Sequence, residues 1–571
     1  MVNEIVTPIA LWRDFDDTLP LKATVLNQSV LSGVVMDEIY FSGRQTGAGR
    51  VRIYAVNFRP QEGTASGAVL ILNDVFSGID KGLAMHFARL GLNVLSVDLR
   101  GETFNGQNFT KYPEDVFYAN AKNTDNTFYF CKNGAKETCW YEWVAVAKYA
   151  VKYLKTTDEK LPITVVGVKH GANVLWQLTM SDPEIKGSVY LFGCGWLAYK
   201  GITKNSDIVL KMDEERYKYL AAVDAQAYAQ YAQNKTLYIT ALNSGEFDVD
   251  RACDTLLRIP GQEAVFSEFC GVADEGLDTD LLITIAEFIK AVNEKGKFTF
   301  KKNPQIKIDV EESEFCAEVT ATVHGDVKNV VCYYAYNAPI PKVRAWLKKE
   351  SYEKFENEKS GNIFKFKLPV YGNVNLMHAY VETEYEDGVK LSSKILCVNT
   401  DVKSPVPCPA VLYGGGGLNA EFIECVEAAY KPDEKAEKYI GFDGSEYREA
   451  FIDKGVFETT DTPLNIKGVK ISGCSAKTYA VRRLTKKPSD SSVIKFDVYL
   501  EAAAELKITL ETVSDDYDYT INLLSGKAWQ NLNLPAGEFK NDKLMGYEGE
   551  DILSLKFTVK GAAVINNVLI L

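Results

Sequence analysis

Histidine and closely spaced cysteine are scarce in this sequence. The chain of 571 residues has four histidines, and its eleven cysteines are spread along it without a Cys-Xaa-Xaa-Cys pair. Zinc sites are built from closely spaced Cys and His side chains, so we expect no metal site. The glycine run Gly414 to Gly417 lacks the Lys-Ser/Thr that completes a P-loop, so it indicates a turn, and no cofactor is expected.

Two of the cysteines lie on either side of a predicted turn. Asn133-Gly134 stands between Cys131 and Cys139, and such a turn could bring the two sulfurs face to face as a disulfide. The alternative is two free thiols beside a surface turn. An odd number of scattered cysteines fits a reducing compartment better.

An excess of positive charge and long apolar runs are also missing. The formal net charge is -13 and the pI is near 5.2, which excludes nucleic acid as an expected partner because phosphate binding needs clustered Lys and Arg. No run approaches the roughly 18 apolar residues of a membrane helix. Met1-Val2-Asn3-Glu4 does not open a signal peptide, so we expect a cytoplasmic chain as written, or an extracellular one if a signal was removed.

What is present points to several folded domains. At about 150 residues per domain, the length suggests three or four. Hydrophobic residues make up 46% and charged residues 25%, which are ordinary values for globular proteins.

The most informative motif is Gly167-Val168-Lys169-His170-Gly171. It has the frame of a Gly-Xaa-Ser-Xaa-Gly nucleophile elbow, in which a buried strand turns sharply into a helix and the central residue is strained and exposed. Ile163 to Val166 is an apolar β-branched run before it, and Ala172 to Met180 has helical spacing after it. Lysine stands where the serine is expected.

Strands and helices alternate around this motif. Ala68 to Asn73 and Leu92 to Val97 are predicted buried strands, Lys81 to Leu90 is a helix, and Trp140 to Leu154 has one apolar helical face. The strand ending at Val97 is closed by Asp98-Leu99-Arg100-Gly101. With the elbow, these features resemble the α/β-hydrolase family, in its esterase, dienelactone-hydrolase and acetyl-xylan-esterase-like branch. The resemblance implies an α/β fold with a doubly wound, mainly parallel sheet over residues 1–298.

The same resemblance shows where the site departs from the family pattern. The acidic triad member is expected after the strand Thr236 to Leu242, where Glu246 and Asp248 both remain candidates. The loop expected to hold the catalytic histidine, Cys270 to Gly276, contains Asp274 but no histidine, and Asp74 stands where backbone donors form an oxyanion hole. The triad-equivalent candidates are Lys169, Glu246, Asp248 and Asp274, and the expected pocket residues are Asp74, Glu102, His170 and Ser244.

Lysine is a poor substitute for the serine. An acyl-lysine is an amide, so deacylation would stall, and a Schiff base would need a lowered pKa, whereas carboxylate neighbours raise the pKa of a lysine. We therefore predict an ion pair between Lys169 and at least one of Asp74, Glu102, Glu246 and Asp274. His170 is interpreted as a polar elbow residue rather than a base.

Beyond Lys295 the pattern changes to extended segments. Residues 299–403 are predicted to form a small β-sandwich, which resembles an immunoglobulin-like or fibronectin-like module. Trp346 is interpreted as a core residue rather than a ligand platform. The expected strands of this sandwich are Cys316 to Val323, Asn329 to Ala335, Ile363 to Leu368, Leu376 to Tyr385 and Val389 to Val398.

Residues 404–571 follow a proline-rich linker and are predicted to form a second all-β sandwich. The expected strands are Ser492 to Leu500, Glu505 to Glu511, Tyr519 to Leu524, Lys527 to Leu534, Ile552 to Val559 and Ala563 to Leu571. The sequence around Trp529 resembles the galactose-binding-like jelly rolls of carbohydrate-binding modules. This implies sugar stacking by Trp529, Tyr517 or Tyr519, although plain strand packing also explains these residues.

The sequence therefore predicts a catalytically degenerate α/β-hydrolase-fold protein with a glycan-associated binding or assembly role. A carbohydrate is the expected ligand, and a protein partner is a further possibility. The alternative is an active carboxyl-ester hydrolase, a deacetylase of acylated carbohydrate, that uses non-standard residues or a water activated by Glu246, Asp248 or Asp274.

Overall fold

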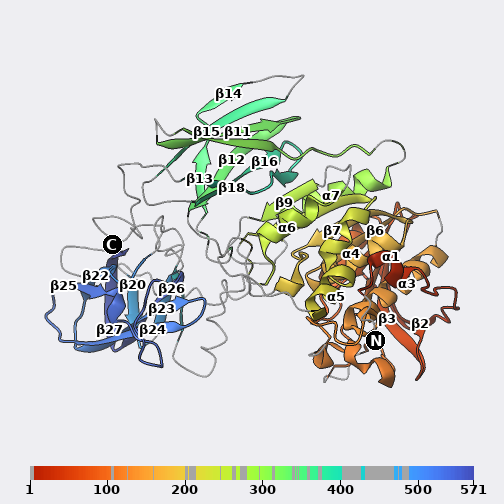
Figure 1. The fold of residues 1–571 in the computed structure, drawn as a ribbon, viewed down its shortest axis with the longest axis horizontal. Coiled ribbons are helices and arrows are strands. Elements are labelled where there is room, and N and C mark those ends of the chain that lie inside the picture. The colour runs from red at the N-terminus through yellow and green to blue at the C-terminus, as the bar shows by residue number, and fades with distance from the viewer. Residues whose placement is uncertain are drawn as a thin grey trace.

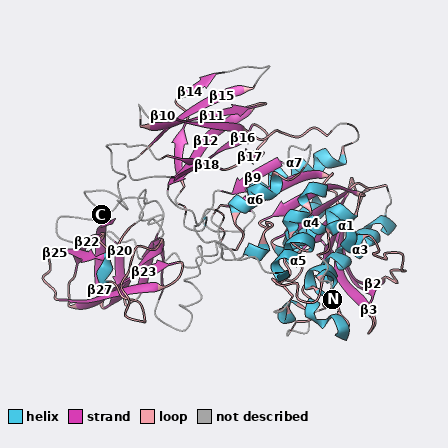
Figure 2. Cartoon of the chain, in the orientation of Figure 1, coloured by secondary structure: helices cyan, strands magenta, loops and turns pink. Residues whose placement is uncertain are grey.

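The computed structural model describes residues 5–400, 426–430 and 469–570, apart from gaps within these ranges, the longest being 205–213, 270–278 and 479–487. The α-helices that it describes all lie before residue 294, and the later part is made mainly of strands (Figures 1 and 2). The predicted Pro-rich linker and the glycine run Gly414 to Gly417 lie outside the described residues.

The N-terminal part is built on one mixed sheet of nine strands, in the order β1-β2-β3-β5-β4-β6-β7-β8-β9. Neighbours from β1 to β5 pair antiparallel, and those from β5 onward pair parallel. This confirms the predicted doubly wound, mainly parallel sheet of an α/β-hydrolase-like fold. The strands are β1 (Thr24–Leu31), β2 (Val34–Gln45), β3 (Arg50–Pro60), β4 (Ala68–Leu72), β5 (Asn93–Val97), β6 (Ile163–Val168), β7 (Ile185–Leu191), β8 (Lys235–Ala241) and β9 (Val265–Phe269).

Helices cover both faces of this sheet. Along β4, Leu70 and Leu72 belong to the apolar cluster that contains α3 and α4, while Val69 and Ile71 belong to the cluster that contains α2 and α7. Successive side chains of a strand point to opposite faces, so a strand covered on both faces is apolar throughout. The helices are α1 (Pro8–Trp12), α2 (Lys81–Arg89), α3 (Cys139–Thr157), α4 (His170–Ser181), α5 (Glu214–Ala222), α6 (Val249–Leu256) and α7 (Thr279–Asn293).

The second part consists of two antiparallel sheets, β10-β11-β15-β14 and β13-β12-β16-β17, with β18 paired to β16. The expected single strand Val389 to Val398 is wrong, because β17 and β18 are two separate strands that both pair with β16. Trp346 packs edge-on against Tyr380, with ring centroids 5.2 Å apart, as expected for a core residue. The strands are β10 (Gln305–Glu311), β11 (Cys316–Val323), β12 (Val327–Tyr336), β13 (Leu347–Glu350), β14 (Glu353–Phe355), β15 (Asn362–Pro369), β16 (Leu376–Tyr385), β17 (Lys390–Ser392) and β18 (Leu396–Asn399).

The first two parts share one hydrophobic core. Phe288 and Ile289 of α7 belong to the same buried cluster as Val319 of β11 and Leu391 of β17. The backbone N–H of Lys390 also donates to Thr284 Oγ1 at 3.0 Å. The predicted boundary at residues 298 and 299 therefore lies within a continuous apolar contact.

The C-terminal part has two further antiparallel sheets, β19-β21-β26-β23-β24 and β20-β27-β22-β25, around a core of its own that includes Phe496 and Phe557. All six strands expected here are present. The strands are β19 (Val426–Tyr430), β20 (Val469–Ser472), β21 (Ser475–Thr478), β22 (Val493–Tyr499), β23 (Ala504–Thr512), β24 (Asp516–Leu523), β25 (Trp529–Pro535), β26 (Ile552–Lys560) and β27 (Ala562–Ile570).

The disulfide considered for Cys131 and Cys139 is not formed, since both are free thiols. Both thiols are buried, whereas Lys132 and Asn133 in the turn between them are exposed. Cys139 begins α3 and its Sγ lies 3.5 Å from the carbonyl oxygen of Thr127. Burial raises the pKa of Cys131 to about 11, which disfavours its thiolate.

Candidate functional site

The backbone at Lys169 has the strained geometry predicted for a nucleophile elbow. Its φ of 51° and ψ of -117° lie in a region that non-glycine residues rarely adopt, at a cost of about 1–3 kcal/mol. The Lys169 N–H donates to Leu191 O at 2.7 Å, and Lys169 O accepts from Ala172 N at 2.9 Å. The strand-turn-helix from β6 to α4 therefore keeps its elbow, although the central residue is lysine.

Both motif glycines are required by close backbone contacts. A Cβ on Gly171 would lie 2.1 Å from Leu72 O, and one on Gly167 would lie 2.6 Å from the Cα of Ala172. Glycine at these positions lets α4 start directly against β4 and β6.

His170, the first residue of α4, is held between two carboxylates. Its Nδ1 lies 2.8 Å from Asp74 Oδ1 and its Nε2 lies 3.3 Å from Glu246 Oε1. Asp74 follows β4 and Glu246 follows β8, so the loops at the carboxyl ends of the parallel strands converge here as the topology predicts. The imidazole is 1% exposed.

Aromatic rings surround the rest of this imidazole. The rings of Phe76, Phe128 and Phe247 lie 5.1–5.2 Å from it, centroid to centroid. Burial opposes the charged form, but the Asp74 and Glu246 carboxylates outweigh it and raise the pKa of His170 above its ordinary value. An imidazole buried between two carboxylates, with Nδ1 bonded to Asp74 and Nε2 facing Glu246, is poorly placed to accept a nucleophile's proton.

The other predicted site residues have local structural contacts. Asp248 caps α6 by accepting from Asp250 N and Arg251 N, and Ser244 Oγ accepts from the backbone N–H of Phe247 at 3.0 Å. Glu102 pairs with Lys122 at 2.8 Å.

Of the eight expected site residues, the structure thus brings together Asp74, His170 and Glu246 beside the Lys169 elbow. Asp274 lies outside the described residues. The predicted ion pair of Lys169 stays a prediction.

No sequence pattern predicts a buried ion pair that lies next to the loop after β8. Arg344, whose side chain is fully buried, holds Asp250 with two hydrogen bonds, one of 2.8 Å between Nη1 and Oδ1 and one between Nη2 and Oδ2. Burial works against ionisation, but the Arg344 guanidinium lowers the pKa of Asp250. Burial and then the nearby Asp250 raise the pKa of Asp248. The second part of the chain is thereby fixed to the first turn of α6.

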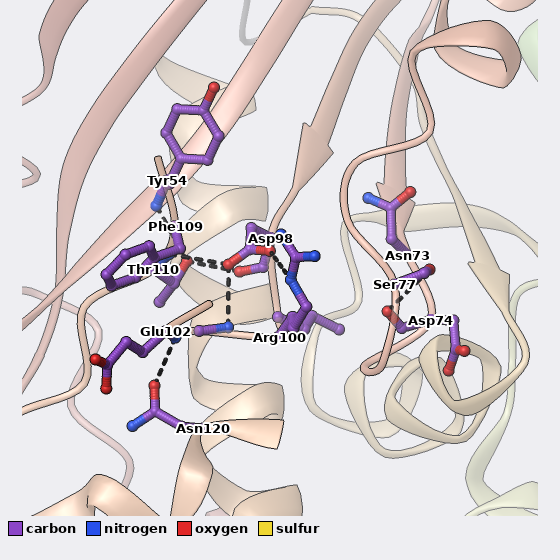
Figure 3. A network of polar contacts seen from close by, with 12 residues as sticks. Tyr54, Asn73, Asp74, Ser77, Asp98, Arg100, Glu102, Phe109, Thr110 and Asn120 are labelled. Carbon is purple, nitrogen blue, oxygen red and sulfur yellow. Dashed lines mark hydrogen bonds and ion pairs between the residues drawn. The ribbon is translucent and has the colours of Figure 1, made fainter. Parts of the chain in front are cut away.

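A second polar cluster lies at the end of β5 (Figure 3). The Asp98 carboxylate accepts from Gly101 N at 3.1 Å and from Thr110 N at 2.9 Å, and Thr110 Oγ1 donates to Asp98 O at 2.6 Å. Burial raises the pKa of Asp98 to about 6 in spite of these hydrogen bonds. The sequence indicated only a turn at this point.

The C-terminal aromatic candidates differ in position. Tyr517 is buried in the core, and its hydroxyl donates to Glu550 Oε1 at 2.8 Å. Tyr519 packs on Phe539, with ring centroids 5.3 Å apart, and Trp529 is half-buried beside Tyr499. Trp529 and Tyr519 thus keep part of their surface open.

In the part of the chain that the structure describes, no cluster of three or more His, Cys, Asp and Glu side chains could hold a metal ion. Within that same part, no helix is both long and apolar enough to cross a membrane.

Comparison with known proteins gives similarities of fold to hydrolases. The acetyl xylan esterase from Paenibacillus sp. R4 is 16% identical, with a TM-score of 0.35, over 47% of this chain and 87% of that one. Acetyl xylan esterase 1 from Thermoanaerobacterium sp. JW/SL YS485 is 12% identical, with a TM-score of 0.31, over 46% and 83%. A putative dienelactone hydrolase from Klebsiella pneumoniae subsp. pneumoniae MGH 78578 is 10% identical, with a TM-score of 0.27, over 41% and 84%.

A scan against protein-family models and a search of curated proteins each find no match. The assignment of an α/β-hydrolase-like fold to this chain rests on its strand order and its elbow.

Proposed function

Because the chain has an α/β-hydrolase-like fold with lysine at its elbow, we propose that it is a non-catalytic binding or assembly protein linked to glycans. The observation that carries the proposal is the buried His170 between Asp74 and Glu246. Next to the elbow, where a hydrolase needs a base that can accept a proton, stands an imidazole buried between two carboxylates.

The positions of the remaining histidines support the same conclusion. His324 and His378 belong to the second part of the chain, and His86 lies on α2 beside Phe87. The loop in which the family carries its histidine has none in the sequence. A covalent cycle would also end at an acyl-lysine, which is an amide and resists hydrolysis.

The proposed binding of glycans rests on the C-terminal part of the chain, residues 404–571, called the C-terminal module below. Trp529 is half-buried on β25 and presents an aromatic surface, and aromatic faces stack on sugar rings. Asn531 on β25 is exposed, and its amide donates at 2.7 Å to the partly exposed Asp497 on the neighbouring strand β22. These polar side chains are the candidates to bind sugar hydroxyls.

Serine-directed labelling tests the non-catalytic assignment. We expect that a fluorophosphonate probe does not label the full chain and that p-nitrophenyl acetate is not turned over above background. Lys169→Ser should still give no turnover, with Lys169→Ala as the matched control. Stoichiometric labelling of any serine in residues 1–298 of the natural chain, Ser244 included, would overturn the proposal.

A second candidate function is ester hydrolysis of acylated carbohydrate through non-standard residues. The observation that favours it is the retained strain at Lys169, since strained backbone is often kept where it serves a site. Turnover by the natural chain that is lost in Glu246→Gln would support this candidate. If only Lys169→Ser gains turnover, the site has a working base and oxyanion hole and lacks only the serine nucleophile.

A further inference from the structure

A cavity of about 420 Å³ lies beside the end of β5, and its lining includes neither the elbow nor His170. Its polar lining comes from four segments of the hydrolase-like part: β2, β3, the start of α2 and the loop after β5. These side chains are Glu38, Tyr54, Lys81, Asp98, Arg100 and Asn108. The volume falls in the usual range for small-molecule sites.

The charges around this cavity balance. Two carboxylates, Glu38 and Asp98, face two cations, Lys81 and Arg100, so the formal charges of the lining cancel. The Lys81 Nζ to Glu38 Oε1 distance is 3.7 Å, and so is the Arg100 Nε to Asp98 Oδ1 distance. Both distances are longer than a hydrogen bond, so neither cation satisfies its carboxylate directly.

The floor of the cavity is formed by the Arg100–Asp98 ion pair. Asp98 is 1% exposed, and its Oδ1 is buried without a hydrogen-bond partner among the described residues, as is Arg100 Nε. The carboxylate is held in place because its other oxygen accepts from Gly101 N and Thr110 N (Figure 3). Asp98 Oδ1 and Arg100 Nε are both buried and lie 3.7 Å apart, so Asp98 holds the Arg100 side chain in place at the floor of the cavity.

The mouth of the cavity is polar and open. The Lys81 side chain is 59% exposed and that of Glu38 25% exposed, while the Arg100 side chain is 22% exposed. Burial and then the Glu38 carboxylate raise the pKa of Tyr54, so its phenol stays a neutral hydroxyl that can both donate and accept. Val56 and Ile79 add apolar surface to the same wall.

We propose that this cavity binds a neutral polyhydroxy molecule of monosaccharide size, whose hydroxyls bridge the Lys81–Glu38 pair and accept from the Arg100 guanidinium that Asp98 holds in place. A hydroxyl can accept from the cation and donate to the carboxylate of one pair at the same time. A charged ligand gains no net Coulomb attraction from a lining whose charges cancel. The site goes beyond the proposed function, because it lies apart from both the elbow and the C-terminal module.

Ligand-observed NMR with the full chain tests this site. D-Xylose and D-glucose are the neutral probes, and acetate, methylammonium and glycine are the charged ones. We expect saturation transfer to the sugars and little to the charged probes. Lys81→Met should weaken sugar binding roughly tenfold, the loss that corresponds to one charged hydrogen bond.

The controls separate this site from others. Arg89→Met, at the exposed end of the same helix α2, should leave sugar affinity and melting temperature unchanged. The proposal is overturned if neither sugar binds up to its solubility limit or if a charged probe binds more tightly. It is equally overturned if Lys81→Met binds like the natural chain, or if Trp529→Ala abolishes binding, which would place the sugar on the C-terminal module.

Discussion

The imidazole of His170 couples the stability of this protein to pH. Its folded-state pKa is raised, so its stabilising contribution is complete below the ordinary histidine pKa of about 6.5 and is lost as the pH rises through the raised value. We expect the difference in unfolding free energy between the natural chain and His170→Gln to shrink as the pH increases. Urea denaturation of both proteins across this pH range measures that difference. The contributions of groups that both proteins share, such as Asp98, cancel in it.

His86 is the control for this prediction, because its pKa is shifted in the opposite direction. Burial on α2 lowers the pKa of His86, so protonation favours the unfolded state and the natural chain should lose stability relative to His86→Gln as the pH falls. Equal slopes for the two histidines would contradict a raised pKa of His170 between two carboxylates.

At the scale of the elbow element, the start of α4 depends on the absence of a side chain at Gly171. A Cβ there would lie 2.1 Å from Leu72 O, and backbone atoms of β4 cannot move away without disturbing the sheet. We expect Gly171→Ala to cost about 3 kcal/mol of unfolding free energy or more. Gly134→Ala, where nothing lies within 4 Å, is the control, and similar losses for the two would refute the steric argument.

Helix α6 depends on a charge from the second part of the chain. Arg344→Met leaves Asp250 buried without its cation, and we expect a loss of about 3–5 kcal/mol in urea unfolding. The double variant Asp250→Asn, Arg344→Met should recover most of this loss. The exposed Lys290–Glu287 pair is the control, and we expect it to contribute less than about 1 kcal/mol to the free energy of unfolding. Additive single effects at Asp250 and Arg344 would show that the pair is not coupled.

At the scale of the whole molecule, the shared core makes residues 1–400 one folding unit. Removing everything after residue 298 exposes Phe288 and Ile289 of α7, which pack in a cluster with the second part. We expect the 1–400 fragment to unfold in one cooperative transition and the 1–298 fragment to bind a hydrophobic dye and melt at lower temperature. Equal melting temperatures for the two fragments would show that the contact is dispensable.

The C-terminal module has a core of its own and should behave independently. Residues 404–571 expressed alone are expected to fold and to carry polysaccharide affinity, which calorimetric titration against plant and microbial polysaccharides measures. Trp529→Ala should weaken binding without unfolding the module, whereas Tyr517→Ala should unfold it, since that ring is in the core. Unfolding by Trp529→Ala would make the tryptophan a core residue.

By itself, the sequence determined the elements whose signals lie within a few neighbouring residues. The apolar run of β6, the glycines of the elbow and the period-two strands such as β11 and β16 are encoded locally, because backbone sterics and side-chain period act over short spans. The strands β2 and β3 were not predicted, because polar residues such as Glu38 interrupt their apolar pattern and antiparallel pairing then decides their burial.

Only the tertiary structure decided which partners meet. His170 and Asp74 are 96 residues apart, and Arg344 and Asp250 are 94 apart, so no local pattern reports their contacts. The sequence left Glu246 and Asp248 open for the acidic position; packing placed Glu246 against His170 and turned Asp248 into a helix cap. Strand period fixes which residues share a face with Tyr517, but the packing of one sheet on another decides whether that face is core or surface.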